Sequence, residues 1–309
     1  MKPIAVTLGD PAGIGAEVVL KALEGLNVPV WLFGCLDHAQ KVWTVPKNVR
    51  FCDIRPNPVE LRFGEVSAEY GRIALDAIDA AVGAIERGEA DTLVTAPIHK
   101  QSIALAGATV PGHTELLAAR AGLERYGYDY AMYFDSPSIR TVLLSVHVPL
   151  AEAIASIDAE KIAALAELTS RSYQRLYGKA PRLVAAGVNP HAGEGGRFGR
   201  EEETILRGVE MARLRGIDIA GPAPADTIFL AARDGKYDVV MAMYHDQGLI
   251  AVKTLEFERS VNVTIGLPYL RCSVDHGTAF DIAGKGVADA RPMRYAIEWA
   301  AQYGERWRR

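Results

Sequence analysis

The chain has 309 residues, of which 49% are apolar and 23% are charged, and its formal net charge is −4 at pH 7. This length is sufficient for one large or two ordinary domains, and the composition is that of a globular protein in water. The slight negative charge does not favour a surface that binds nucleic acid or a membrane.

The cysteines and the first residues bear on the cellular compartment. Cys35, Cys52 and Cys272 are odd in number and form no C-x-x-C pair, which favours free thiols in a reducing cytosol. The opening MKPIAVTLGD lacks the apolar stretch of a signal peptide. No apolar run approaches the ~18 residues of a membrane-spanning helix. We therefore expect a cytoplasmic protein.

Strand-like and helix-like segments alternate along the chain. Residues 4–8 form an apolar run that predicts a strand, and residues 13–26 have a helical pattern. Between residues 70 and 88, apolar side chains recur at the helical spacings of three and four. A further helix is expected at 158–178, with Asp158 as its N-cap, and further strands at 28–34, 91–97, 130–135, 140–150, 182–189, 238–246 and 261–268. This alternation predicts an α/β fold with mostly parallel sheets.

Three histidines share one setting in this pattern. His147, His191 and His245 each follow an apolar strand at its carboxyl end, where the ligand crevice of open α/β sheets lies. Three imidazoles suit a divalent metal with one open catalytic position. The alternative is that each is hydrogen-bonded locally at its strand end. Asp226 and Asp246 are candidates for a carboxylate ligand or for a partner that orients an imidazole. Asp226 is alternatively an ordinary helix N-cap.

A second set of polar residues is typical of an anion site. Lys253, Asn262 and Arg271 flank and interrupt a strongly apolar stretch, and these residue types suit a phosphate or a carboxylate. The alternative is that they extend from strand ends into solvent. His113 precedes Thr114, a natural N-cap of the next helix, where an imidazole can donate to an anion. The alternative there is capping alone.

Two glycine-rich segments raise the question of a nucleotide site. Residues 9–15 (GDPAGIG) follow the first predicted strand, but no G-x-G-x-x-G fingerprint follows a strand anywhere. We interpret residues 10–15 as a tight turn that lines the site without binding phosphate. Residues 275–286 (DHGTAFDIAGKG) either wrap a cofactor or form a helix from Thr278 to Gly284.

Seven motifs together resemble those of the 4-hydroxythreonine-4-phosphate dehydrogenase family of vitamin B6 biosynthesis. They are GDPAGIG, TAPIHK, GHTE, NPHAGE, GPAPADT, AMYHDQG and SVDHGTAFDIAGKG, in order from residue 9 to residue 286. The resemblance implies an enzyme that depends on NAD and on a divalent metal (zinc, cobalt, manganese or magnesium). It would oxidise 4-phosphooxy-L-threonine to 2-amino-3-oxo-4-phosphooxybutanoate. That product decarboxylates to 3-amino-2-oxopropyl phosphate, a step toward pyridoxal 5'-phosphate.

The resemblance also implies roles for individual residues. The loop 276–284 is similar to the loop that binds the adenosine part of NAD in isocitrate and isopropylmalate dehydrogenases. The proton acceptor stays open among Lys253, Asp246 and a metal-bound water. The implied metal ligands are His147, His191 and His245; the implied substrate-binding residues are His113, Thr114, Lys253, Asn262 and Arg271; the implied cofactor-binding residues are His276, Gly277, Thr278 and Asp281.

The same resemblance implies a domain arrangement. The expected fold is that of isocitrate and isopropylmalate dehydrogenases, with two intimately joined α/β domains and an active site in the cleft between them. Residues 1–125 with 262–309 would form the domain with the cofactor loop, and residues 126–261 the domain with the metal histidines. Family members are homodimers whose sites draw residues from both subunits.

Other functions stay open on the sequence alone. One is a dehydrogenase of a related substrate, threonate or erythronate 4-phosphate. Another is a metal-dependent lyase or hydrolase without NAD, which the missing dinucleotide fingerprint favours and turnover without NAD would reveal. A third is a non-catalytic metabolite-binding protein, against which the three strand-end histidines argue.

Overall fold

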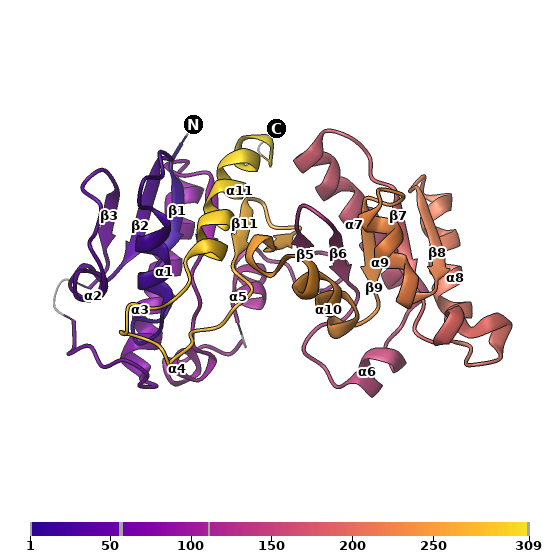
Figure 1. Cartoon of the computed structure of the whole chain (residues 1–309), viewed down its shortest axis with the longest axis horizontal. Helices are drawn as coiled ribbons and strands as arrows, with labels where there is room; N and C mark the ends of the chain where they lie inside the picture. The colour runs from indigo at the N-terminus through magenta and orange to yellow at the C-terminus, as the bar shows by residue number, and fades with distance from the viewer. Residues whose placement is uncertain (1, 56–57, 111, 308–309) are drawn as a thin grey trace. The chain divides into compact units, whose positions relative to one another are not determined.

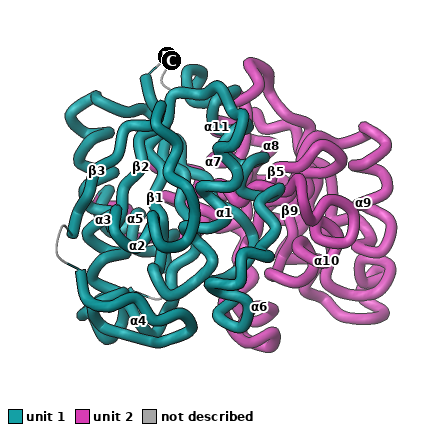
Figure 2. The backbone as a smooth tube through the Cα atoms, turned by 60° about the vertical axis from the view of Figure 1, so that its left-hand side comes forward, with its two compact units in different colours: residues 1–121, 268–309 teal, residues 122–267 magenta. Residues whose placement is uncertain are grey.

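The chain divides into two compact units. Unit 1 comprises residues 1–121 and 268–309, and unit 2 comprises residues 122–267 (Figure 2). In both units strands alternate with helices, which confirms the predicted α/β class. The structure, a computed structural model (Figure 1), describes residues 2–55, 58–110 and 112–307.

Unit 1 contains a parallel sheet with helices packed on it. Its strands are β1 (Ile4–Thr7), β2 (Val30–Gly34), β3 (Arg50–Asp53), β4 (Thr92–Thr95) and β11 (Leu270–Ser273). Its helices are α1 (Gly15–Ala22), α2 (Leu36–Val42), α3 (Ala68–Glu86), α4 (Lys100–Leu105), α5 (His113–Arg120) and α11 (Arg291–Trp307). The order is β3-β2-β1-β4-β11, and every adjacent pair is parallel. Helix α3 packs on β1 and β2, and α11 on β4 and β11, which explains why every residue of the central strands is buried.

Unit 2 contains a mixed sheet. Its strands are β5 (Ala131–Asp135), β6 (Arg140–Leu143), β7 (Leu183–Ala186), β8 (Ile219–Ala223), β9 (Val239–Ala242) and β10 (Val261–Ile265). Its helices are α6 (Leu150–Ala155), α7 (Ala159–Tyr177), α8 (Glu201–Leu214), α9 (Ala225–Arg233) and α10 (His245–Glu256), with 3-10 turns η1 (Pro190–Gly196) and η2 (Phe257–Arg259). The order is β10-β5-β6-β9-β7-β8. The pairs of β5 with β10 and with β6 are antiparallel, and the pairs from β6 to β8 are parallel.

Local chemistry explains where several elements begin and end. The Asp158 carboxylate accepts a hydrogen bond from the backbone N–H of Lys161 at 2.8 Å, so the predicted N-cap of α7 is confirmed. The strand predicted over 140–150 is wrong beyond Leu143. His147 has a φ of 49°, a left-handed conformation that no strand accommodates, and Pro149 is the N-cap of α6.

Two further predictions concern the thiols and the membrane. Cys35, Cys52 and Cys272 are free thiols, as their odd number and spacing predict. In the part of the chain that the structure describes, none of the helices has the length and apolar character needed to cross a membrane.

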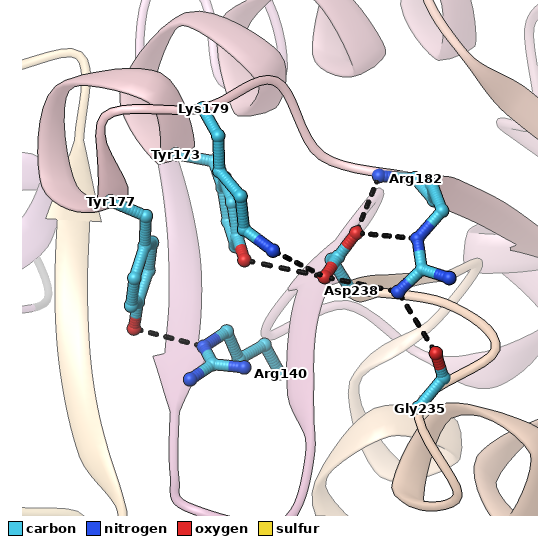
Figure 3. Close-up of polar contacts among 7 residues, drawn as sticks. All are labelled: Arg140, Tyr173, Tyr177, Lys179, Arg182, Gly235 and Asp238. Atoms are coloured by element: carbon cyan, nitrogen blue, oxygen red, sulfur yellow. Dashed lines mark hydrogen bonds and ion pairs between the residues drawn. The ribbon is translucent and has the colours of Figure 1, made fainter.

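A partly buried polar cluster lies at the amino-terminal ends of the parallel strands of unit 2 (Figure 3). Asp238, one residue before β9, accepts hydrogen bonds from the backbone N–H and the Nε of Arg182 at 2.8 and 3.0 Å. Arg182 is one residue before β7, so the pair ties the starts of two adjacent strands together. Nearby, Nε of Arg140 donates to the hydroxyl of Tyr177 at 2.9 Å and pairs with Asp135 at 3.2 Å. These contacts hold the strand register at one edge of the sheet.

The charge of Asp238 makes this cluster sensitive to pH. Burial raises the pKa of Asp238, but hydrogen bonds from Arg182 and the charges of Lys179 and Arg182 outweigh burial and lower it to about 2. A depressed carboxyl pKa contributes stability above the unfolded-state value of 3.8 that is lost as the pH falls toward 2.

We expect Asp238→Asn to lower the free energy of unfolding by about 2 kcal/mol at pH 7. The deficit relative to the wild type should shrink by about half when the pH is lowered to about 3, because the wild-type carboxylate then loses its advantage. Urea unfolding at several pH values measures both. Asp234→Asn, at an exposed carboxylate, is the control. A deficit that does not change with pH would contradict the assignment.

Candidate functional site

The three strand-end histidines all lie in unit 2, at one edge of its sheet. His147 comes four residues after β6, His191 five residues after β7, and His245 three residues after β9. These strands are parallel and adjacent in the order β6-β9-β7. Because parallel neighbours end at the same edge of a sheet, their loops emerge side by side.

Two of these imidazoles lie next to one another. The ring centroids of His147 and His245 are 5.7 Å apart, close to the roughly 5 Å expected for two imidazoles on one tetrahedral zinc ion. Both rings line a cavity of about 200 Å³. Its lining consists of Ser145, Val146, His147, Val148, Leu150, Ala153, Tyr244, His245 and Asp246.

Asp246 orients one of the rings. Its Oδ1 lies 2.7 Å from Nδ1 of His245, and because a carboxylate only accepts, Nδ1 carries the proton of the neutral ring. This tautomer leaves Nε2 of His245 with a lone pair, as a metal ligand requires. Asp226 lies in the first turn of α9, whose N-cap is Pro224. The alternative reading of Asp226 as the N-cap is therefore wrong.

His191 lies in a turn with unusual backbone geometry. His191, Ala192 and Glu194 have φ values of 54°, 52° and 42°, and the His191 ring centroid is 6.4 Å from that of Phe198. Among the described residues, no group of three or more His, Cys, Asp or Glu side chains is close enough to hold a metal ion. The pair of His147 and His245, with Asp246 against one ring, suits a metal ion. His191, on the adjacent loop, does not complete a set of three with them among the described residues.

Unit 1 holds a buried cation and a buried imidazole. Arg271, in β11, is 2% exposed, and its Nη2 donates to Oγ1 of Thr95 at 2.7 Å. Burial lowers the pKa of Arg271 to about 10, so the guanidinium is still charged at neutral pH. Burial, and then the charge of Arg271, hold the pKa of His113 well below its usual range. Within the described residues, Nε2 of His113 is buried without a hydrogen-bond partner.

The helix that contains GHTE begins two residues earlier than predicted. The N-cap of α5 is Gly112, and His113 is its first residue, so the prediction of Thr114 as the N-cap is wrong. Gly112 is extended, with a φ of −172°, and it therefore takes the cap position. Thr114 is buried in the first turn of α5.

The other two predicted substrate residues lie in unit 2. Lys253 is on α10, so the apolar stretch around it is a helix at this point and not a strand. Asn262 is in β10 and is 8% exposed. Among the described residues, no hydrogen-bond partner is present for its buried Oδ1. A buried amide oxygen without a partner is costly, which is typical of a ligand-binding position.

The opening glycine loop contacts the predicted cofactor loop within unit 1. The backbone N–H of Ile14 donates to the carbonyl of Thr278 at 3.0 Å. A Cβ on Gly13 would lie 2.9 Å from that same carbonyl, so only glycine allows this approach. The loop forms a turn in which the N–H of Gly13 donates to the carbonyl of Asp10 at 3.1 Å. The helix considered for Thr278 to Gly284 is absent; the segment is made of turns.

One end of the cofactor loop presents a buried acceptor. Nδ1 of His276 lies 3.0 Å from the carbonyl of Gly277 and therefore donates to it. Nε2 of His276 is buried and has no partner among the residues described. Within the loop, a Cβ on Gly277 would meet no atom within 4 Å. Thr278 and Asp281 follow, with the carbonyl of Asp281 accepting from Nζ of Lys285 at 2.7 Å.

His99, for which no role is predicted, lies beside the predicted cofactor loop. Its ring stacks on Phe280 with centroids 4.6 Å apart, and its Nδ1 accepts from the N–H of Ser102 at 3.3 Å. Burial raises the pKa of the neighbouring Asp10. A signal for His99 was present, because it too follows a strand, β4, at its carboxyl end.

Comparison with known proteins places this geometry in a family. Residues 9–300 match the family described as the pyridoxal phosphate biosynthetic protein PdxA. A 4-hydroxythreonine-4-phosphate dehydrogenase of Beijerinckia indica is 40% identical, covering 97% of this chain and 94% of its own. A D-threonate 4-phosphate dehydrogenase of Salmonella typhimurium is 39% identical, covering 97% and 98%.

A solved structure agrees with both relatives. The 4-hydroxythreonine-4-phosphate dehydrogenase of Klebsiella pneumoniae has a TM-score of 0.88 and 36% identity, covering 98% of this chain and 97% of its own. The match covers nearly the whole chain, and the relatives are named as dehydrogenases. The chain therefore belongs to the PdxA family of 4-hydroxythreonine-4-phosphate dehydrogenases and their relatives.

Proposed function

We propose that the chain oxidises the secondary hydroxyl of 4-phosphooxy-L-threonine, with NAD and a divalent metal. The ketone, 2-amino-3-oxo-4-phosphooxybutanoate, then loses CO₂ to give 3-amino-2-oxopropyl phosphate. The observation that carries the metal dependence is the pairing of His147 and His245 beside a cavity. The dehydrogenase names of the relatives support the redox chemistry over a lyase or hydrolase without NAD.

The metal would be held by histidines of unit 2. His147 and His245 would supply two ligands and His191 the third, and Asp246 keeps Nε2 of His245 available through its hydrogen bond to Nδ1. When bound, the ion would supply Lewis-acid polarisation of the substrate's hydroxyl oxygen, and NAD would supply the acceptor for the hydride. The metal would be zinc, cobalt, manganese or magnesium, and imidazole ligands favour zinc and cobalt over the other two.

The anionic ends of the substrate would be bound by the buried polar residues. Arg271 carries a charge in an apolar setting, where binding a phosphate or carboxylate compensates its burial. His113, held neutral, can offer a hydrogen bond at Nε2 without adding a second charge beside Arg271. Thr114, Lys253 and Asn262 are the other proposed substrate-binding residues, and the proton acceptor stays open among Lys253, Asp246 and a metal-bound water.

NAD would be bound at the loop that includes His276, Gly277, Thr278 and Asp281. Because Nδ1 of His276 donates to the carbonyl of Gly277, Nε2 is an acceptor. It suits a hydroxyl or amino group of a nucleoside. A cytoplasmic location and a homodimer with shared sites stay predictions.

D-threonate 4-phosphate is a second candidate substrate. Relatives with this name are as similar to the chain, at 39% identity, as those named for 4-hydroxythreonine 4-phosphate, at 40%. The two substrates differ at C2, where one has an amino group and the other a hydroxyl, while the phosphate and carboxylate are shared. The preference of the enzyme for one of these substrates depends on the protein groups that contact the C2 substituent.

A screen for NADH formation at 340 nm tests the proposed reaction. With NAD and Mn²⁺ or Co²⁺, we expect 4-phosphooxy-L-threonine to be oxidised with a kcat/KM at least about tenfold above that of D-threonate or erythronate 4-phosphate, a difference of about 1.4 kcal/mol in transition-state binding. The reverse order would assign the chain to the second candidate. If none of these compounds yields NADH, the proposed dehydrogenase activity is wrong.

Removal of the metal or of His245 should stop the reaction. We expect His245→Ala to lower kcat/KM by about 10³-fold or more, because Lewis-acid stabilisation is worth several kcal/mol, and to lower the bound metal measured by elemental analysis. Chelation followed by addition of Zn²⁺, Co²⁺ or Mn²⁺ should restore the wild type and not the variant. Glu210→Ala, on an exposed position of α8, is the control. Full activity of the chelated wild type would refute the metal dependence.

The lowered pKa of His113 predicts a dependence of stability on pH. Below about pH 6.5 the unfolded chain binds a proton at this histidine and the folded chain does not. Folding of the wild type should therefore weaken relative to His113→Gln as the pH falls from 7.5 to 5. Chemical unfolding of both proteins at each pH measures the difference. A constant difference across this range would mean that His113 titrates normally in the folded protein.

A further inference from the structure

The loops that carry the three strand-end histidines are joined by side-chain hydrogen bonds. The backbone N–H of Leu144 donates to the carbonyl of Ala242 at 2.8 Å, which extends the pairing of β6 with β9 by one residue. Beyond it, the buried hydroxyl of Ser145 donates to the carbonyl of Met243 at 2.9 Å. The loop that leads to His147 is thereby fixed to the residues that lead to His245.

Gln247 makes the next connection. Its Oε1 accepts from the backbone N–H of Met243 at 2.7 Å, and its Nε2 donates to the carbonyl of Gly187 at 2.8 Å. Met243 follows β9, and Gly187 follows β7. One carboxamide thus holds the carboxyl ends of two adjacent strands at a set spacing, and it uses both of its functional groups to do so.

Glu202, in the first turn of α8, connects that helix to the segment that follows β7. Its carboxylate is buried at 7% exposure. Oε1 accepts from the backbone N–H groups of Val188 and Asn189 at 2.9 and 2.7 Å, and Oε2 accepts from Nδ2 of Asn189 at 2.9 Å. A Cβ on Gly193 would lie 2.7 Å from Oε2. The turn from Val188 to Gly193 is therefore wrapped around this carboxylate.

The turn needs such support because its conformation is intrinsically unfavourable. His191, Ala192 and Glu194 occupy the left-handed region without being glycine, and such residues keep this conformation only where the surroundings hold them. The hydrogen bonds of Glu202 go to the backbone immediately before His191. They fix the backbone from which the imidazole of His191 extends.

We propose that Gln247 and Glu202 are positioning residues that set the spacing of the loops bearing His147, His191 and His245, and thereby the affinity of the chain for a divalent metal. The proposal rests on the metal site of the proposed function. Neither side chain needs to touch the ion. Each acts through the backbone of a ligand-bearing loop, as polar groups beyond the ligands do in other metal sites.

Titration of metal-free protein with Co²⁺ by calorimetry, together with the visible spectrum of bound Co²⁺, tests the proposal. Gln247→Met keeps the length of the side chain and removes both hydrogen bonds, and Glu202→Gln puts an NH₂ group against Nδ2 of Asn189. We expect each variant to raise the Kd for Co²⁺ about tenfold or more and to shift the Co²⁺ spectrum. Glu202→Ala should weaken binding more than Glu202→Gln, which retains one acceptor for the turn.

Matched controls separate positioning from general stability. Gln174→Met and Glu203→Gln alter exposed positions of α7 and α8 and should bind Co²⁺ as the wild type does. Urea unfolding of each metal-free variant shows whether it is folded. A wild-type Kd in both Gln247→Met and Glu202→Gln, or a loss of stability without a change in Kd, overturns the proposal. If the wild type itself binds no Co²⁺, Zn²⁺ or Mn²⁺, the metal site of the proposed function fails, and this inference fails with it.

Discussion

The parallel alignment of β6, β9 and β7 is the constraint on which the candidate metal site depends. Neighbouring parallel strands run in one direction, so the segments that leave their carboxyl ends share one edge of the sheet. His147, His191 and His245 come from segments far apart in the chain, yet they emerge from three adjacent strands. At the opposite ends of β7 and β9, the hydrogen bonds between Asp238 and Arg182 hold the strands in register. The distance between the loops that carry His191 and His245 therefore depends on the register of β7 and β9.

The candidate site residues of the two units differ in burial and in charge. In unit 2 the imidazoles are at least partly accessible, and their neighbours are carboxylates and amides that orient side chains or loops. In unit 1 a guanidinium is almost fully buried at Arg271, and the imidazole of His113 is kept neutral by the same burial. Burial of a charge is costly, and Oγ1 of Thr95 accepts one hydrogen bond from the guanidinium. The proposed function assigns this pair of side chains to the anionic ends of the substrate.

The glycine-rich opening segment supports another loop and is not a conventional nucleotide fingerprint. Gly13 has no Cβ, so the backbone of the segment can approach the carbonyl of Thr278 closely, and Ile14 donates a hydrogen bond to that carbonyl. His99, which follows β4, stacks on Phe280 of the same loop and so holds that loop in place. The glycines after β1 therefore allow close packing of two loops. The spacing of glycines in a sequence does not by itself distinguish this role from phosphate binding.

The amino-acid sequence by itself determined the α/β class, the positions of most strands and the family, because apolar periodicity and ordered motifs are local properties. It also placed three histidines at strand ends. Only the tertiary structure decided that His147 and His245 lie together while His191 stands in a left-handed turn, that α5 begins at His113, and that Lys253 lies on a helix. Contacts such as Gln247 with Gly187, 60 residues apart, depend on strand order. Strand order results from the packing of the whole unit, so a local sequence pattern does not predict it.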